Sequence, residues 1–455
     1  MVEPTLGRGP LHIARSAPGA TARARMATVV AIAKRWRALP IAIGLLLALG
    51  FGGDLTSALA GVGGLAWRLG ALLLVLLACR GRFNADGGIA FALTFLPWLA
   101  ASMIEMTVFL DVDHVSDYAR QTFMVVVGAA VYAAAQSREK RGQVQIALLC
   151  AALLAAVLST IMTIPLLQHG WSWEAVRASK NELVLTTGFG ANTVCFAGMI
   201  AAIASPQSGP ERLVGRGLVV FFTVLSIILG ARAPIALFFL SALVAVPLSR
   251  RSWPGGRGRL ASALRLSSLV IGAIVLCFLL SIPLIARSFI ADGLAGRAGL
   301  WQIALRGWLD APVFGHGVHS WVDVVQQNLG AAEYRTMYEM QSTAALRTGG
   351  FHNVWMNTLA ERGLIGLAGL YASYCLLLAR LIANLPFKGR EQRFQALVLF
   401  LFVFLRSFVE ITGLMSYSDA ALDAIVIAAL AVTAAGEPPR RRRRVRHRLP
   451  VERSA

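Results

Sequence analysis

Long apolar runs recur along this chain of 455 residues, and they restrict its possible folds more than any other feature. A run of roughly 18 or more apolar residues is long enough to cross a bilayer as a helix. The composition agrees, because 57% of the residues are hydrophobic and 15% are charged, whereas soluble globular domains carry roughly 25% charged residues. The sequence therefore predicts an all-α polytopic membrane protein.

The apolar runs predict about 12 transmembrane helices with one long hydrophilic excursion between them. Residues 288–352 form this excursion, which is rich in aromatic residues and predicts a folded loop with an interfacial helix near 298–309. The predicted organisation is a basic tail at 1–38, transmembrane regions at 39–287 and 353–435, and a second basic tail at 436–455. The predicted spans are 39–53, 61–79, 88–109, 119–136, 144–166, 186–205, 215–230, 233–249, 266–287, 354–383, 395–412 and 420–435.

Lysine and arginine residues give the chain a net charge of +20 and fall mainly in every second loop and in the tails. An excess of these residues on the cytoplasmic side is typical of inner membrane proteins. We therefore expect both termini to be cytoplasmic and residues 288–352 to be extracytoplasmic. The arginine-rich run at 440–448 is expected to contact membrane lipids and not nucleic acid.

Neither the cysteines nor any known phosphate-binding or metal-binding motif in the sequence indicates a cofactor. The five cysteines lie far apart, in or beside apolar runs, and no CxxC or Cys/His spacing occurs. The chain also lacks a phosphate-binding glycine loop and an HExxH motif. We therefore expect no cofactor, no metal and no disulfide framework.

A histidine marks the boundary between the long polar segment and the apolar run at 354–383. His352 and Asn353 directly precede this run, so the imidazole can face water and a membrane-held molecule together. With an unperturbed pKa near ~6.5, an imidazole can take a proton from a hydroxyl group near neutral pH. The alternative is a helix-capping or interfacial residue. Other histidines on the predicted outer side mean that composition alone does not select this one.

Several charged residues occupy similar boundaries or lie within apolar runs. Arg232 falls between two runs, and Arg297 begins the predicted interfacial helix. A guanidinium can hold phosphoryl oxygens with two hydrogen bonds, although an interfacial or solvated arginine is the alternative. Arg406, spaced i, i+4 from Glu410, and Glu105 lie within predicted spans, where ionisable residues are candidates for function or for buried ion pairs.

Together these motifs resemble those of the O-antigen ligase and polymerase superfamily, over roughly residues 190–415. The order and spacing of the motifs carry the resemblance. The matching residues are His352-Asn353 with Leu359, Glu361, Gly363 and Ile365-Gly366, and upstream Arg232, Arg297, Trp301, Pro312, Gly315 and Gly317; Asn192 is a looser match.

The resemblance implies an integral glycosyltransferase of the bacterial inner membrane. Its substrate would be an undecaprenyl-pyrophosphate-linked glycan at the periplasmic face, and neither a nucleotide sugar nor a metal would be needed. Ligases of this family pass the glycan to lipid A–core, and polymerases pass it to a second lipid-linked glycan; we favour the ligase. The resemblance further implies that Arg232 and Arg297 engage the pyrophosphate and that His352 activates the acceptor hydroxyl. We expect Trp301, Asn353 and Arg406 to contact the substrate as well.

Two other classes of function are consistent with a polytopic membrane protein. A secondary transporter would require repeated halves with paired helix breaks near the midplane, and the sequence offers one possible break, near Arg232. A structural scaffold would not need a histidine beside an arginine-bearing outer segment. The enzyme therefore ranks first, the transporter second and the scaffold last.

Overall fold

The computed structural model describes residues 85–109, 115–168, 191–229, 232–251, 259–288, 297–318, 320–328, 350–409 and 420–436. These residues form helices joined by turns, and no β-strand occurs among them, which confirms the all-α fold class for this part of the chain. The α-helices are α5 (Ala85–Ala92), α6 (Leu96–Phe109), α7 (Val115–Ala135), α8 (Arg138–Gln168), α10 (Ala191–Ile203), α11 (Pro210–Ile228), α12 (Arg232–Arg250), α13 (Arg259–Ser288), α14 (Arg297–Asp310), α15 (Trp321–Asn328), α18 (Val354–Asn384), α19 (Arg390–Arg406) and α20 (Ala420–Ala434); a 3-10 helix, η2 (Leu385–Phe387), follows α18.

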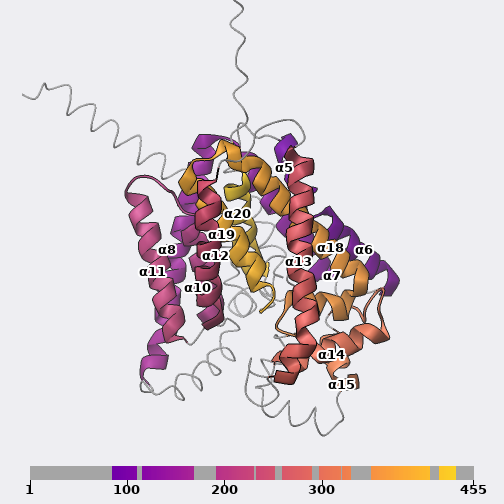
Figure 1. The fold of residues 1–455 in the computed structure, drawn as a ribbon. Helices are drawn as coiled ribbons and strands as arrows, with labels where there is room; N and C mark the ends of the chain where they lie inside the picture. Colours follow the sequence, from indigo (N-terminus) through magenta and orange to yellow (C-terminus); the bar gives the residue numbers. More distant parts are fainter. Residues whose placement is uncertain are drawn as a thin grey trace, which may run out of the picture.

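Two groups of helices flank a central pair (Figure 1). Helices α8, α10, α11 and α12 lie on one side, and α6, α7, α13 and α18 lie on the other, with α19 and α20 between them. Packing contacts connect the layers: α12 packs on α19, α13 on α18, and α7 on α20. Helices α14 and α15 lie at one end of this bundle.

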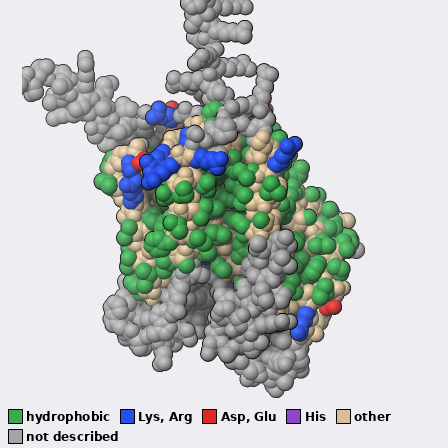
Figure 2. Space-filling model, viewed as in Figure 1, with side chains coloured by type: hydrophobic (Ala, Val, Ile, Leu, Met, Phe, Trp, Pro, Cys, Tyr) green, Lys and Arg blue, Asp and Glu red, His purple; other side chains and the backbone are tan. Residues whose placement is uncertain are grey.

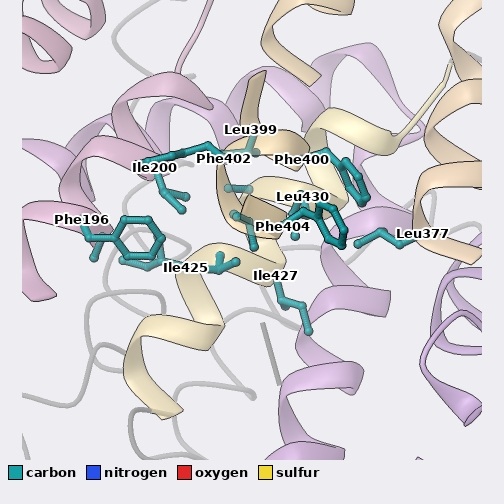
Figure 3. Packing of buried hydrophobic residues seen from close by; sticks show 14 of the residues in the cluster. Phe196, Ile200, Leu377, Leu399, Phe400, Phe402, Phe404, Ile425, Ile427 and Leu430 are labelled. Carbon is teal, nitrogen blue, oxygen red and sulfur yellow. The ribbon is translucent and has the colours of Figure 1, made fainter. Parts of the chain in front are cut away.

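Helix α19 is central because its residues 396–405 are all apolar, so this part of the helix is apolar on every side. A helix that is hydrophobic all round is stable only when it is buried. Its residues 396–400 and 402–404 are all buried, and Figure 3 shows several of them among side chains from α10, α18 and α20. On one face, the ring of Phe402 packs edge-on against Phe196 of α10 and Phe238 of α12. The helix therefore joins the two groups.

Aromatic side chains attach the opposite face of α19 to α18. Phe400, Phe404 and Phe408 follow one another at intervals of four residues, so they lie on one side of the helix and the turn after it. The indole of Trp355 stacks on Tyr374 within α18 and on Phe408, with ring centroids 5.6 and 5.3 Å apart. This contact holds the start of α18 against the end of α19.

The predicted spans coincide in large part with helices wherever the structure describes them. Two helical stretches, Arg138–Ile161 and Val354–Phe387, are long and apolar enough to cross a membrane, and the α5–α6 pair makes a third if it is one bent span. The full set of about 12 spans stays a prediction. The spans at 39–53 and 61–79, and most of both tails, lie outside the described residues.

The predicted span 88–109 is not one straight helix. Helices α5 and α6 meet at an angle of 54° across a short break. Pro97 occupies the first turn of α6, where its missing amide costs nothing, but its ring does not allow a helix to continue through from α5. The proline therefore explains the bend.

Helix α18 also breaks, at Gly363, whose φ of 59° and ψ of −154° are not helical. The small-residue spacing of Gly363, Gly366 and Gly369 predicts close helix packing, which holds for Gly369 against Pro97 and Ala101 of α6. It is wrong for Gly363. A Cβ at that position would lie 2.5 Å from the carbonyl carbon of Val313, so glycine is needed for the close approach of another main chain.

Residues 312–317 supply the hydrogen bonds that the break in α18 would leave open. Four main-chain hydrogen bonds join the two segments: His316 N to Ala360 O, Gly317 N to Glu361 O, Leu364 N to Pro312 O and Ile365 N to Val313 O, at 3.1, 2.8, 2.9 and 3.2 Å. Buried main-chain groups need such partners. We call this arrangement the backbone clasp; it fixes the end of α14 against the middle of α18.

Basic side chains gather at one end of the molecule, above a band of hydrophobic ones (Figure 2). This basic end holds the start of α19 and the end of α12, which are joined by a hydrogen bond from Arg393 Nη1 to Arg251 O (3.1 Å). Helices α14 and α15 lie at the opposite end (Figure 1). This separation matches the charge pattern that predicts a cytoplasmic basic side.

We predict that Gly363→Ala destabilises the protein by about 1–3 kcal/mol, because a left-handed backbone is strained for alanine and the new Cβ would enter the backbone clasp. Thermal unfolding of the detergent-solubilised protein measures this as a lower melting temperature. The matched control is Gly142→Ala in α8, where nothing lies within 4 Å of the new Cβ. Equal melting temperatures for the two variants would contradict the prediction.

We predict that Gln327, at the exposed end of α15, faces the outside of the cell and Glu139, at the start of α8, faces the cytoplasm. In a cysteine-free background, an impermeant thiol reagent added to intact spheroplasts should label Gln327→Cys. It should reach Glu139→Cys only after permeabilisation. The reverse pattern would overturn the orientation derived from the loop charges.

Candidate functional site

A tight turn at residues 350–353 presents His352 at the start of α18. His352 has a φ of 50°, which makes it the one non-glycine residue with positive φ in the described part of the chain. Histidine adopts this left-handed conformation more readily than most residues, but the conformation is uncommon and requires support from its surroundings. Its neighbours Phe351 and Asn353 are both fully buried, whereas His352 is half-buried. The turn therefore anchors both flanking residues and leaves His352 partly exposed.

Asn353 anchors the turn on its C-terminal side. Its Oδ1 accepts from the amides of Trp355 and Met356 at 2.9 and 3.0 Å, which caps the first turn of α18. Its Nδ2 donates to the carbonyl of Phe408 at 2.7 Å. With these three bonds and full burial, Asn353 positions the turn from within the protein; contact with a substrate stays a prediction.

Trp301 anchors the turn on its N-terminal side. Its indole Nε1 donates to the carbonyl of Phe351 at 3.0 Å, and the indole itself is buried. The ring of Phe351 also meets that of Trp321 edge to face. Helices α14 and α15 therefore hold the turn directly, and the role of Trp301 that the structure describes is to position His352.

The end of α19 completes the support. The amide of Val354 donates to Ser407 O at 2.9 Å, and the indole Nε1 of Trp355 donates to Ser407 Oγ at 2.7 Å. Ser407 is the C-cap of α19, and both its carbonyl and its hydroxyl oxygen accept hydrogen bonds from the start of α18. Sequence analysis did not select this serine, because a lone serine at a helix end carries no distinctive pattern.

A buried ion pair lies beside the backbone clasp. Arg362 Nε is 2.8 Å from Glu105 Oε2, and both side chains are almost fully buried. Arg362 also donates from Nη1 to Ser102 Oγ at 2.6 Å, and its guanidinium lies 4.2 Å above the ring centroid of Trp98. The pair joins α6 to α18 next to Gly363. Of its two charges, only Glu105 was considered from sequence, although Arg362 carries the same signal of a charge within an apolar run.

The predicted arginines lie at the same end of the bundle as His352. Arg250 and Arg390 line one groove, so α12 ends where α19 begins and the two helices are antiparallel. Arg232, which starts α12, therefore lies near the level where α19 ends. Arg297 starts α14 one turn before Trp301. The backbones of the two arginines are described and their side chains are not, so a shared site with His352 stays a prediction.

Three helix N-termini consequently point to this end, those of α12, α14 and α18. A helix N-terminus carries a partial positive charge that favours a nearby anion, although the first amides of α18 already donate to Ser407 and Asn353. Within the described ranges, no group of three His, Cys, Asp or Glu residues is placed to hold a metal ion. The N-termini of α12 and α14 favour a nearby anion, whereas the C-terminus of α19 at the same end carries the opposite partial charge.

Arg406 is buried away from the turn, although it directly precedes Ser407. Its guanidinium carbon lies 3.4 Å from the ring centroid of Phe196, which places the charge against α10. Glu410, its predicted ion-pair partner, lies outside the described residues, and α19 ends at Arg406. The predicted ion pair of Arg406 with Glu410 therefore stays a prediction.

The described residues form an apolar helical bundle with an anchored histidine turn at one end, and the long apolar helices indicate a membrane protein. Residues 217–371 match the family model described as O-antigen ligase. The match confirms the resemblance to the O-antigen ligase and polymerase superfamily, and the matched segment includes Arg232, Arg297 and His352. A comparison with curated proteins gave no match.

We predict that Glu105→Leu and Arg362→Met each destabilise the protein by about 3–5 kcal/mol, since each leaves one buried charge without its partner. The double variant should recover most of this loss, because no buried charge then remains at the pair. Melting temperatures of the four proteins in one detergent test the cycle. A double variant less stable than both single variants would show that the two residues act independently.

Proposed function

We propose that the chain is a membrane glycosyltransferase that moves a glycan from undecaprenyl pyrophosphate to an acceptor hydroxyl at the periplasmic face, of the O-antigen ligase type. The observation that carries the proposal is the anchored turn: His352 is held in a left-handed conformation at the start of α18, at the end of the bundle where α12 and α14 also begin, within the segment that matches the family. Strained backbone of this kind clusters at functional sites.

The proposed reaction is a single displacement with inversion at the anomeric carbon. His352 takes the proton of the acceptor hydroxyl while its oxygen forms the new bond to that carbon. The bond from the anomeric carbon to the pyrophosphate oxygen breaks, and undecaprenyl pyrophosphate leaves with the electron pair. The reaction needs no further reactant.

Arg232 and Arg297 are proposed to stabilise the charge that develops on the leaving pyrophosphate. Both begin helices, so each adds a cation to an end that already favours anions. Fixed positive groups directed at a developing charge are among the largest contributions to catalysis. In this scheme Trp301 and Asn353 act through the turn that they support.

We predict that His352→Asn lowers turnover by roughly 100- to 10,000-fold, the usual contribution of a general base. Asparagine tolerates the left-handed backbone but cannot accept the proton near neutral pH, so this variant separates chemistry from folding. Arg297→Ala should also reduce transfer and weaken binding of the pyrophosphate lipid. The matched control is His447→Ala in the basic tail, which should retain full activity.

The assay is complementation of a ligase-deficient and, separately, a polymerase-deficient bacterial strain, with surface polysaccharide analysed on a gel. Capping of lipid A–core that depends on His352 supports the ligase. A restored ladder of repeat units would instead make the chain a polymerase. Full activity of correctly inserted His352→Asn in either strain would remove the general base from the scheme.

A further inference from the structure

A second site lies at the basic end, on the side of the molecule away from His352. A groove of about 670 Å³ opens between α11, α12 and α19. This volume falls within the range of small-molecule sites. Neither the proposed transfer reaction nor the matched family description assigns a role to it.

The rim of the groove is strongly basic. Arg212 and Arg216 come from the first turns of α11, Arg250 from the end of α12 and Arg390 from the start of α19. One carboxylate, that of Glu391, stands among them and pairs with Arg212 at 2.5 Å. In the described part of the chain, Arg250 and Arg390 have no ion pair, so the rim holds uncompensated positive charge.

The wall of the groove below the rim is apolar. It is formed by valines and phenylalanines of the same three helices: Val219, Val220, Phe238, Val246, Phe394 and Val398. Phe238 precedes Arg250 by 12 residues, which is about 18 Å along α12. One leaflet of the hydrocarbon core measures about 15 Å, half of its full thickness. The groove therefore extends from a charged rim to the depth of one leaflet.

We propose that this groove binds an anionic phospholipid, with its phosphodiester headgroup on the arginine rim and an acyl chain along the apolar wall. Guanidinium groups bind phosphoryl oxygens with paired hydrogen bonds, and basic pockets between membrane helices suit anionic headgroups. A free phosphate ion would use the rim but not the wall. The charges in Figure 2 gather where such a headgroup would lie.

The test is native mass spectrometry of the full-length protein titrated with phosphatidylglycerol, with phosphatidylcholine of the same acyl chains and with inorganic phosphate. Preferential binding of phosphatidylglycerol is expected. Arg250→Gln and Arg390→Gln should each weaken it about fivefold, and together about 25-fold. Both side chains are exposed and form no described ion pair, so the variants keep the fold.

The matched control is Arg265→Gln, which removes an exposed arginine of α13 outside the groove and should leave binding unchanged. An equal loss in this variant would show that only the general surface charge attracts the lipid, and would overturn the site. Equal affinity for phosphatidylglycerol and phosphatidylcholine would overturn the proposed site as well. So would inorganic phosphate that binds in place of both lipids. Because the readout is lipid binding, its result is independent of the proposed glycan transfer.

Discussion

The backbone clasp between residues 312–317 and the broken helix α18 is the interaction on which the rest of the end that carries His352 depends. It relies on two glycines with positive φ, Gly315 and Gly363, because a side chain at either would overlap the opposing main chain. Through the clasp, the segment that begins with α14 is tied to the helix that begins with the histidine turn. The buried pair of Glu105 and Arg362 then fixes the same part of α18 to α6. The position of His352 therefore follows from main-chain geometry as much as from its own contacts.

The basic groove and the histidine turn lie at opposite ends of the molecule, and α19 extends from one to the other. At the start of α19, Arg390 lines the basic groove. Directly after its end, Ser407 accepts hydrogen bonds from the amide of Val354 and the indole of Trp355. Between these points, residues 396–405 of the helix are all apolar, and most of them are buried. A central helix of this kind sets the distance between the basic groove and the histidine turn, since its length is fixed by regular hydrogen bonding.

Hydropathy predicted the helices well, because burial in an apolar surrounding demands long runs of apolar residues regardless of their detailed packing. The boundary position of His352 was also predictable, since a histidine before an apolar run is visible in the sequence. The support of the turn was not. Asn353 and Trp301 were expected to contact substrate, but their described hydrogen bonds lie within the protein, and nothing in their spacing indicates which partner they choose. The break at Gly363 was missed for a related reason: a glycine that packs closely and a glycine that turns the chain look the same in sequence.

The clasp and the contact of Trp321 with Phe351 have a consequence for how such chains can diverge. They hold the described residues that precede and follow positions 329–349. Lengthening a loop whose ends are already held costs little, about 0.6 kcal/mol for each doubling of its length. Insertions and deletions there can accumulate without moving the histidine. A change of length between these points therefore leaves the helical frame and the turn at His352 in place.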